Sequence, residues 1–166
     1  MATFETVLGR CAVSWTADGI SGVELPSSRT RDVPSIDERA PDFAQAAAKA
    51  MAAVLAGERP DLRDVPLDER GIDPFRRQVY AATRAIPSGT TATYGEIARA
   101  IGRPDGARDV GAALARNPYP IVVPCHRVVA ANGALTGFSA PGGIATKRRM
   151  LQLEGAPGFG QLALFG

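Results

Sequence analysis

The amino-terminal stretch of the chain alternates short apolar runs with turn residues. Two apolar runs flank Asp18-Gly19 in "CAVSWTADGISGVELP" (11–26), and an Asp-Gly pair in that setting is typical of a tight β-hairpin. The Ala-rich stretch 41–57 has a proline near its first turn and a glycine at its end, which predicts a helix. The stretch "LRDVPL" (62–67) predicts a short strand.

From residue 72 onward the pattern becomes mostly helical. Asp73 can cap a helix that carries Pro74 in its first position, and Thr93 with Glu96 three residues later makes a capping-box pattern. The predicted elements are helices over 72–87, 93–102 and 107–117, a short buried strand over 121–123, a long glycine-rich loop over 130–143, and an amphipathic helix over 144–155. A loop of that length inside a compact domain is usually functional or disordered.

These elements predict an α/β protein with two domains and a tail. We expect a small amino-terminal α/β domain with a short antiparallel sheet over residues 1–71, placing the boundary in the polar stretch "DERG". A mostly helical carboxy-terminal domain over 72–157 would contain a helix-turn-helix, and 158–166 would form a tail. Spacing alone is a weak signal for a helix-turn-helix, because any small helical protein offers such pairs.

The charge of the chain is divided between the two predicted domains. Residues 1–71 carry 8 Lys and Arg against 12 Asp and Glu, a balance of −4, whereas residues 72–166 carry 11 against 5, a balance of +6. This asymmetry indicates that the second domain meets a polyanion. The alternative is a surface whose charge has drifted into two blocks.

The apolar segments and the cysteines limit the cellular compartments in which the protein is expected to act. No apolar run approaches the roughly 20 residues of a membrane helix, and the first residues lack a secretion signal pattern. Two cysteines, Cys11 and Cys125, cannot build a disulfide framework, so we expect reduced thiols and a cytoplasmic protein that contacts no membrane. One histidine and two distant cysteines do not supply a tetrahedral ligand set, so we expect no metal.

The stretch "PIVVPCHRVV" (120–129) sets Cys125 beside His126, the single histidine of the chain. A cysteine is nucleophilic only as thiolate, and a neighbouring base or positive charge, such as Arg127, would lower its pKa. Adjacent residues in a strand point to opposite faces, so a direct contact requires the chain to bend after Pro124; otherwise a water must bridge the pair. The alternative is a structural cysteine beside a core histidine, since cysteine is often buried.

The longest informative pattern is "PCHRVV", preceded by "ARNPYPIVV" and followed by "GFSAPGG". It resembles the active-site signature of the O6-alkylguanine-DNA alkyltransferases, the methylated-DNA–protein-cysteine methyltransferases. The resemblance covers most of residues 72–157 in order and spacing, and it extends more loosely to 1–71. It implies repair of O6-alkylguanine in duplex DNA by a monomer that needs no cofactor and acts once, because the alkylated cysteine is not regenerated.

The resemblance also implies roles for individual residues. Cys125 would accept the alkyl group, His126 would deprotonate the thiol through a water, and Glu154 would hold the imidazole. Asn117 would tie the recognition helix to the active-site segment, and Tyr94 would line the pocket and donate to guanine N3. Without the family, Glu154 is an ordinary surface carboxylate, Asn117 a helix-ending residue and Tyr94 simply the first residue of a helix.

The base pocket implied by the family includes Val128, Phe138 and Ser139, with Ser139 meeting O6. Many members have a tyrosine where this chain has Phe138, so a hydroxyl is missing there. Gly95 and two extra residues in "SAPGG" differ from the family pattern and leave the range of alkyl groups open. The amino-terminal domain lacks the zinc ligands of some members, so we expect it to be structural, with Cys11 as a packing residue.

Contact with DNA would come from the helix over 107–117. Arg108 would fill the space left by a flipped base, since O6 is out of reach inside the stack. Gly111 and Ala112 make the helix thin enough for the minor groove, about 6 Å wide, and Arg116 and Tyr94 complete the predicted DNA-binding set. Small residues that pack this helix against another are the alternative, and both can hold on different faces.

Two other functions compete with repair. An alkyltransferase-like sensor would flip the lesion without repairing it, but such relatives replace the acceptor cysteine and Cys125 is present. A cysteine hydrolase built on Cys125 and His126 would need turnover and an oxyanion hole, and it would leave the basic helix-turn-helix unexplained.

Overall fold

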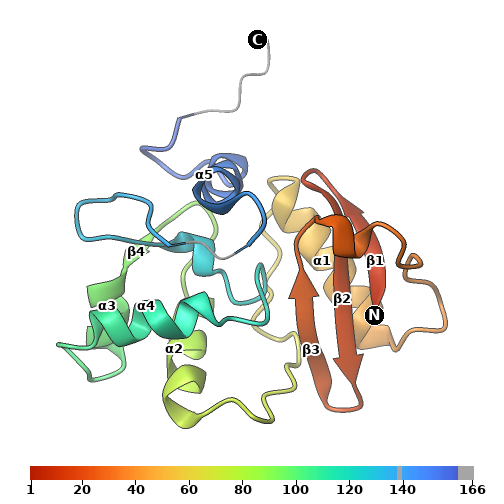
Figure 1. The fold of residues 1–166 in the computed structure, drawn as a ribbon, viewed down its shortest axis with the longest axis horizontal. Helices are drawn as coiled ribbons and strands as arrows, with labels where there is room; N and C mark the ends of the chain where they lie inside the picture. The colour runs from red at the N-terminus through yellow and green to blue at the C-terminus, as the bar shows by residue number, and fades with distance from the viewer. Residues whose placement is uncertain (138–139, 161–166) are drawn as a thin grey trace.

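The computed structural model describes residues 1–137 and 140–160. An antiparallel sheet with one long helix forms the amino-terminal part, and a group of shorter helices forms the carboxy-terminal part (Figure 1). The elements are β1 (Ala2–Thr6), β2 (Gly9–Thr16), β3 (Gly19–Glu24), η1 (Ser28–Thr30), α1 (Asp42–Leu55), α2 (Pro74–Arg84), β4 (Ala92–Thr93), α3 (Tyr94–Ala100), α4 (Ala107–Ala115), η2 (Cys125–Arg127), β5 (Val128–Val129) and α5 (Gly143–Leu153). This arrangement confirms the predicted α/β class.

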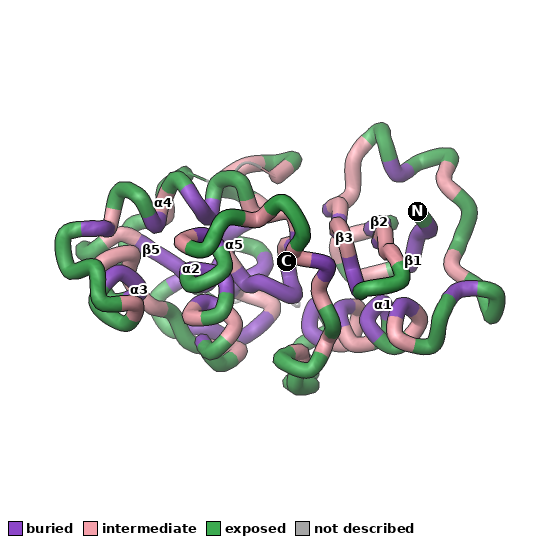
Figure 2. Tube along the Cα trace, turned by 90° about the horizontal axis from the view of Figure 1, so that it is seen from below, coloured by how far each residue is buried: buried purple, intermediate pink, exposed green. Residues whose placement is uncertain are grey.

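The predicted hairpin is present as β2 and β3, which pair antiparallel on either side of Asp18-Gly19. Gly19 has φ +145°, and a Cβ there would lie 2.6 Å from Pro66 O, so this turn requires a glycine. The helix α1 covers the sheet with its small and apolar residues. Buried positions gather where α1 faces the strands (Figure 2).

The strand predicted over 62–67 is wrong, because the chain turns there. Arg63 N donates to Asp61 Oδ1 at 2.9 Å, which closes a local turn. Pro66 has no N–H to give to a ladder, so pairing is limited to one isolated parallel bridge between Leu67 and Ile20.

The helices of the carboxy-terminal part begin as their capping residues predict. Asp73 accepts from Arg76 N with Pro74 in the first turn of α2, and Thr93 accepts from Glu96 N at the start of α3. Helices α3 and α4 follow each other across a short turn and pack together, which confirms the helix-turn-helix. Among the described residues, no helix combines the length and apolarity needed to cross a membrane.

The strand predicted over 121–123 is also wrong, although these residues are buried as expected. Ile121 has φ +76°, and Val123 N donates to Tyr119 O at 2.8 Å, so the segment is a tight turn. Prolines deny this stretch several donors. The Asn117 side chain makes hydrogen bonds in place of the missing backbone ones: it donates to Val123 O and accepts from Tyr119 N, both at 2.9 Å.

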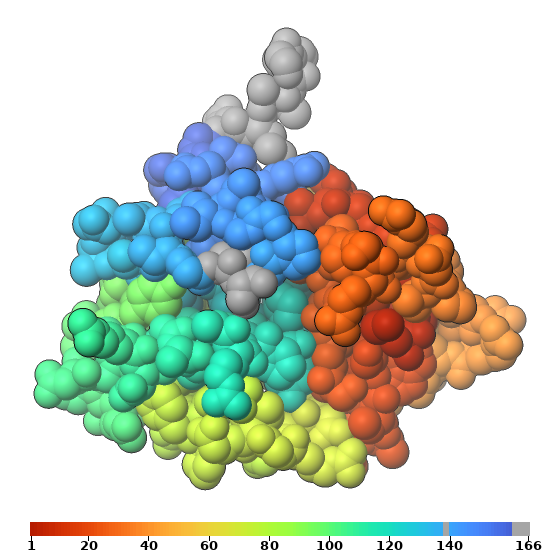
Figure 3. Space-filling model, in the orientation of Figure 1, coloured from red at the N-terminus to blue at the C-terminus, as the bar shows by residue number. Residues whose placement is uncertain are grey.

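The two parts of the molecule join along this turn. Val23 N at the edge of β3 donates to Pro118 O at 2.9 Å, and the Tyr119 hydroxyl donates to Asp68 O. A single cluster of buried apolar residues runs through both parts. The space-filling view shows them meeting along one seam (Figure 3). The amino-terminal sheet therefore holds the segment that leads to Cys125.

Candidate active site

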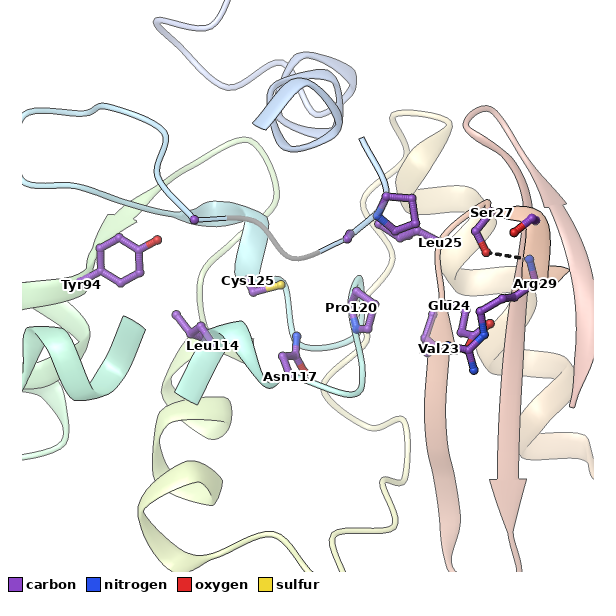
Figure 4. Close-up of a pocket in the computed structure, with 14 residues that line it drawn as sticks. Val23, Glu24, Leu25, Ser27, Arg29, Tyr94, Leu114, Asn117, Pro120 and Cys125 are labelled. Carbon is purple, nitrogen blue, oxygen red and sulfur yellow. Dashed lines mark hydrogen bonds and ion pairs between the residues drawn. The ribbon is translucent and has the colours of Figure 1, made fainter. Parts of the chain in front are cut away.

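Cys125 begins the short helix η2 and faces a cavity of about 360 Å³. The bend after Pro124 is present, since Arg127 N donates to Pro124 O at 2.9 Å. Both parts of the molecule line the cavity: Val23, Glu24, Leu25, Ser27, Ser28, Arg29, Tyr94, Leu114, Asn117, Pro120, Cys125, Gly137, Ala140 and Pro141. In Figure 4 the sulfur lies between Tyr94 on one side and Pro120 with the amino-terminal residues on the other.

His126 follows Cys125 in η2 and is fully buried. Its Nε2 lies 2.8 Å from Glu154 Oε1, and its Nδ1 is buried without a hydrogen-bond partner among the described residues. An ionised carboxylate can only accept, so Nε2 carries the proton and Nδ1 keeps a free lone pair. His126 is therefore built to receive a proton at Nδ1.

Glu154 is held by three side chains at the end of α5. Besides His126, the Arg127 guanidinium donates to both carboxylate oxygens, and the Ser88 hydroxyl donates to Oε2 at 3.0 Å. Burial alone would raise the pKa of Glu154, but the contacts with His126 and Arg127 lower it to about 2. Glu154 is thus a buried anion, and the alternative of a plain surface carboxylate is wrong.

Arg127 does not provide the positive charge expected beside the thiol. Its guanidinium points to Glu154 and donates to Ile86 O at 2.8 Å, because the turn of η2 directs neighbouring side chains apart. Burial raises the pKa of the Cys125 thiol, with an Asn117 hydrogen bond and the Lys147 charge opposing it. Burial likewise lowers the pKa of His126, although the nearby Glu154 carboxylate acts to raise it. Both groups are neutral near pH 7, so the thiol needs a base when it reacts.

Lys147 is the charged residue near the thiol that sequence reasoning missed. It is 1% exposed, and its Nζ donates to Thr136 O at 3.1 Å and to the Tyr94 hydroxyl at 3.4 Å. The ammonium also lies 5.8 Å from the Tyr94 ring centre. Lys147 lies on the buried side of α5, because it precedes Met150, Leu151 and Glu154 by three, four and seven residues. This spacing can be recognised in the sequence.

The predicted DNA-binding residues lie on α3 and α4. Arg108, Ala112 and Arg116 are exposed and four residues apart, so they share one face of α4. Gly111 lies beside Tyr94, where an added Cβ would be 3.8 Å from the ring. The helix therefore exposes a thin, basic face and packs with its small residue against Tyr94.

Three pocket predictions have different outcomes. Val128 lies in β5, paired with Ala92, and is fully buried outside the cavity lining, so its contact with a base stays a prediction. Phe138 and Ser139 lie outside the described residues. Leu114 and Pro120 line the cavity, and nothing in their sequence surroundings singled them out.

The structural role expected for the amino-terminal domain stays a prediction, but this part also contributes to the site. The segment from the last residue of β3, Glu24, to Arg29 in η1 forms one wall of the cavity that Cys125 faces. The backbone bond between Val23 and Pro118 holds this segment against the active-site turn. Such a contact joins residues about 100 positions apart, so no local pattern could have indicated it.

The fold and the site together define a class: helix-turn-helix proteins with a cysteine, histidine and glutamate grouped at a pocket. Comparisons narrow the class. The family described as "6-O-methylguanine DNA methyltransferase, DNA binding domain" matches residues 74–156. A methylated-DNA–protein-cysteine methyltransferase of Methanosarcina acetivorans is 38% identical over 93% of this chain and 97% of its own. A crystal structure of Mycobacterium tuberculosis OGT in complex with DNA has a TM-score of 0.75 at 38% identity, covering 95% of both chains.

The chain belongs to the methylated-DNA–protein-cysteine methyltransferase family. A relative with a different name is also similar: a "DNA base-flipping protein" of Thermus thermophilus is 41% identical over 74% of this chain and 84% of its own. The chain is therefore similar to relatives that carry two different names.

Proposed function

We propose that this protein repairs O6-alkylguanine in duplex DNA by transferring the alkyl group to its own Cys125. The observation that carries the proposal is the placement of the thiol. It faces a cavity that Tyr94 of α3 and Leu114 of α4 line, and the next residue along the chain, His126, is a buried neutral imidazole that a buried carboxylate orients. Family membership supports the same activity.

The transfer is an in-line displacement. Cys125 Sγ attacks the alkyl carbon next to oxygen, a carbon–sulfur bond forms, and the carbon–O6 bond breaks with its electron pair left on guanine. His126 Nδ1 takes the thiol proton across a water. That proton then passes through solvent to the guanine anion, so the products are S-alkylcysteine, neutral guanine and the neutral imidazole. The thioether has no route back to the thiol, so each molecule acts once.

Several residues prepare this step without reacting. Asn117 ties α4 to the turn before Cys125 and hydrogen-bonds the thiol. Glu154 fixes the tautomer of His126. In this proposal Tyr94, which lines the cavity, donates to the leaving base at N3. Lys147 holds Tyr94 and adds positive charge near the sulfur, which favours the anionic character that develops there.

The target base must leave the duplex to reach Cys125. Arg108 occupies the vacated space, while Ala112, Gly111 and Arg116 lie along the minor groove and its phosphates. Binding dominated by phosphates gives affinity with little sequence preference and weakens as salt rises. We propose a cytoplasmic location, since a thiol that acts on chromosomal DNA must stay reduced.

A damage sensor that binds the lesion without repairing it is the second candidate, favoured by the likeness to the base-flipping protein. The test is to mix the purified protein with a duplex that contains one O6-methylguanine and to measure the intact mass with peptide mapping. We expect one added methyl group on Cys125, saturating at one per protein. An unmodified protein that still binds this duplex would be a sensor and would overturn the proposal.

A further inference from the structure

The wall that the amino-terminal part contributes to the cavity is polar and charged. Arg29 Nη2 lies 3.1 Å from Glu24 Oε1, and Arg29 N donates to Ser27 Oγ at 3.1 Å. The second carboxylate oxygen, Glu24 Oε2, is buried and has no hydrogen-bond partner among the described residues. The wall thus offers the Arg29 guanidinium as a donor that Glu24 holds in place, while the second Glu24 oxygen is buried.

This wall lies on the side of the sulfur opposite Tyr94. Figure 4 shows Tyr94, Cys125, Pro120 and then the Glu24–Arg29 pair in that order across the cavity. In an in-line displacement the sulfur, the reacting carbon and O6 share one axis, so the rest of a longer alkyl group must leave that axis sideways. With the base held beside Tyr94, the remaining space of the cavity runs past Pro120 to the amino-terminal wall.

We propose that the Glu24–Arg29 pair determines which alkyl groups are transferred, favouring groups that end in a hydroxyl over hydrocarbons of equal length. The inference rests on the proposed function. A hydroxyl can accept a hydrogen bond from the Arg29 guanidinium, which Glu24 holds in place, whereas a methyl end of the same size makes no hydrogen bond there. A methyl adduct is too short to reach the wall.

The experiment uses three duplexes of one sequence that carry O6-methylguanine, O6-(2-hydroxyethyl)guanine or O6-propylguanine. Single-turnover transfer rates are measured with the full chain, and the quantity compared is the ratio of the hydroxyethyl rate to the propyl rate. Intrinsic reactivity of the two adducts cancels when this ratio is compared between variants. Failure to transfer from O6-methylguanine would refute the proposed function itself, whereas normal methyl transfer leaves the ratio as the test of the inference.

The decisive variant is the double substitution Glu24→Leu/Arg29→Leu. We expect the ratio to fall about three- to tenfold relative to wild type, as for the loss of a hydrogen bond. The matched control is Glu5→Leu/Arg10→Leu, which removes an exposed Glu–Arg pair at 2.8 Å on the same sheet, away from the cavity, and should keep the wild-type ratio. Glu24→Gln/Arg29→Lys keeps hydrogen-bonding groups on both side chains and should also largely keep it.

An unchanged ratio in Glu24→Leu/Arg29→Leu would overturn the inference, and so would an equal fall in the control. Circular dichroism establishes that each variant is folded. If the double variant is not folded, Arg29→Leu alone decides, because that side chain is 78% exposed and its loss leaves the core intact. A lower ratio in Arg29→Leu supports the inference, and a wild-type ratio rejects it.

Discussion

The surroundings of the two cysteines differ although both thiols are buried enough for their pKa to rise. Cys11 lies in β2 with no exposed surface, and the Thr6 hydroxyl lies 3.7 Å from its sulfur. Burial raises the pKa of Cys11 to about 11. Cys125 is partly exposed to a cavity and has Asn117, Lys147 and the His126–Glu154 pair around it.

This difference shows that a raised thiol pKa does not by itself distinguish a packing cysteine from a catalytic one. Burial stabilises the neutral thiol at both sites. The region around Cys125 adds an open face through which a substrate can reach the sulfur. It also adds a base with a free lone pair and a nearby positive charge, and these two stabilise the sulfur as it reacts. Reactivity therefore depends on the neighbours of the thiol, and each region can be tested by removing them.

The largest expected effect comes from the thiols themselves. Cys125→Ser should lose alkyl transfer completely within the detection limit and keep binding to the lesion, because the hydroxyl is a far weaker nucleophile at neutral pH. Cys11→Ala should transfer normally while lowering the free energy of unfolding by about 1 kcal/mol. Intact mass and urea unfolding measure the two outcomes; transfer by Cys125→Ser would refute the assignment.

Removing the carboxylate behind His126 should have the next largest effect. Glu154→Gln leaves Arg127 buried without its anion and releases the imidazole, so we expect about 100-fold slower transfer and a loss of about 3 kcal/mol in stability. Ser88→Ala, which removes a single hydrogen bond to the same carboxylate, is the matched control and should change the rate only a few-fold. Equal rates for Glu154→Gln and wild type would exclude the relay.

The same carboxylate predicts how stability depends on pH. The folded-state pKa of Glu154, about 2, lies below its usual value of 4.5. Its contribution is therefore complete above pH 4.5 and is lost as the pH falls toward 2, about 3 kcal/mol in all. Urea unfolding of wild type and Glu154→Gln across this window should show the difference between them shrinking with acid; a constant difference would contradict the assignment.

Replacing one exposed arginine in each part of the molecule tests whether only the carboxy-terminal part acts on duplex DNA. Arg108→Ala should slow repair in duplex DNA about tenfold and leave the reaction with free O6-alkylguanine nearly unchanged. Arg39→Ala removes an exposed arginine of the amino-terminal part that pairs with Asp37 and should alter neither reaction. Equal slowing of both reactions by Arg108→Ala would reject its role in base flipping.

The smallest expected effect is that of pH on transfer. The pKa of His126 lies below its usual value of 6.5, and that of Cys125 lies above 9.0. The imidazole is therefore an available base and the thiol stays protonated throughout that interval, so the rate should vary by less than about threefold between pH 6.5 and 9. A tenfold rise per pH unit would instead show that preformed thiolate does the chemistry.

Local signals account for the parts of the fold that were predicted correctly. Asp73 before Pro74, and Thr93 three residues before Glu96, start helices through bonds within four residues, so their outcome depends little on the rest of the chain. The strand predicted over 121–123 was wrong because a buried apolar stretch is compatible with a strand and with a turn. The Asn117 side chain, which supplies the hydrogen bonds that a ladder would have made, decided between them.

The sequence by itself determined the main candidates for chemistry: a cysteine and histidine side by side, and a thin basic helix after a turn, with Glu154 added by the resemblance to the family. These depend on residue identity and spacing along the chain. Only the tertiary structure decided that Lys147 lies near the sulfur, that Arg127 holds Glu154, and that Glu24 and Arg29 wall the cavity. Those contacts join separate elements, and burial sets the pKa of each group only after the chain has closed around it.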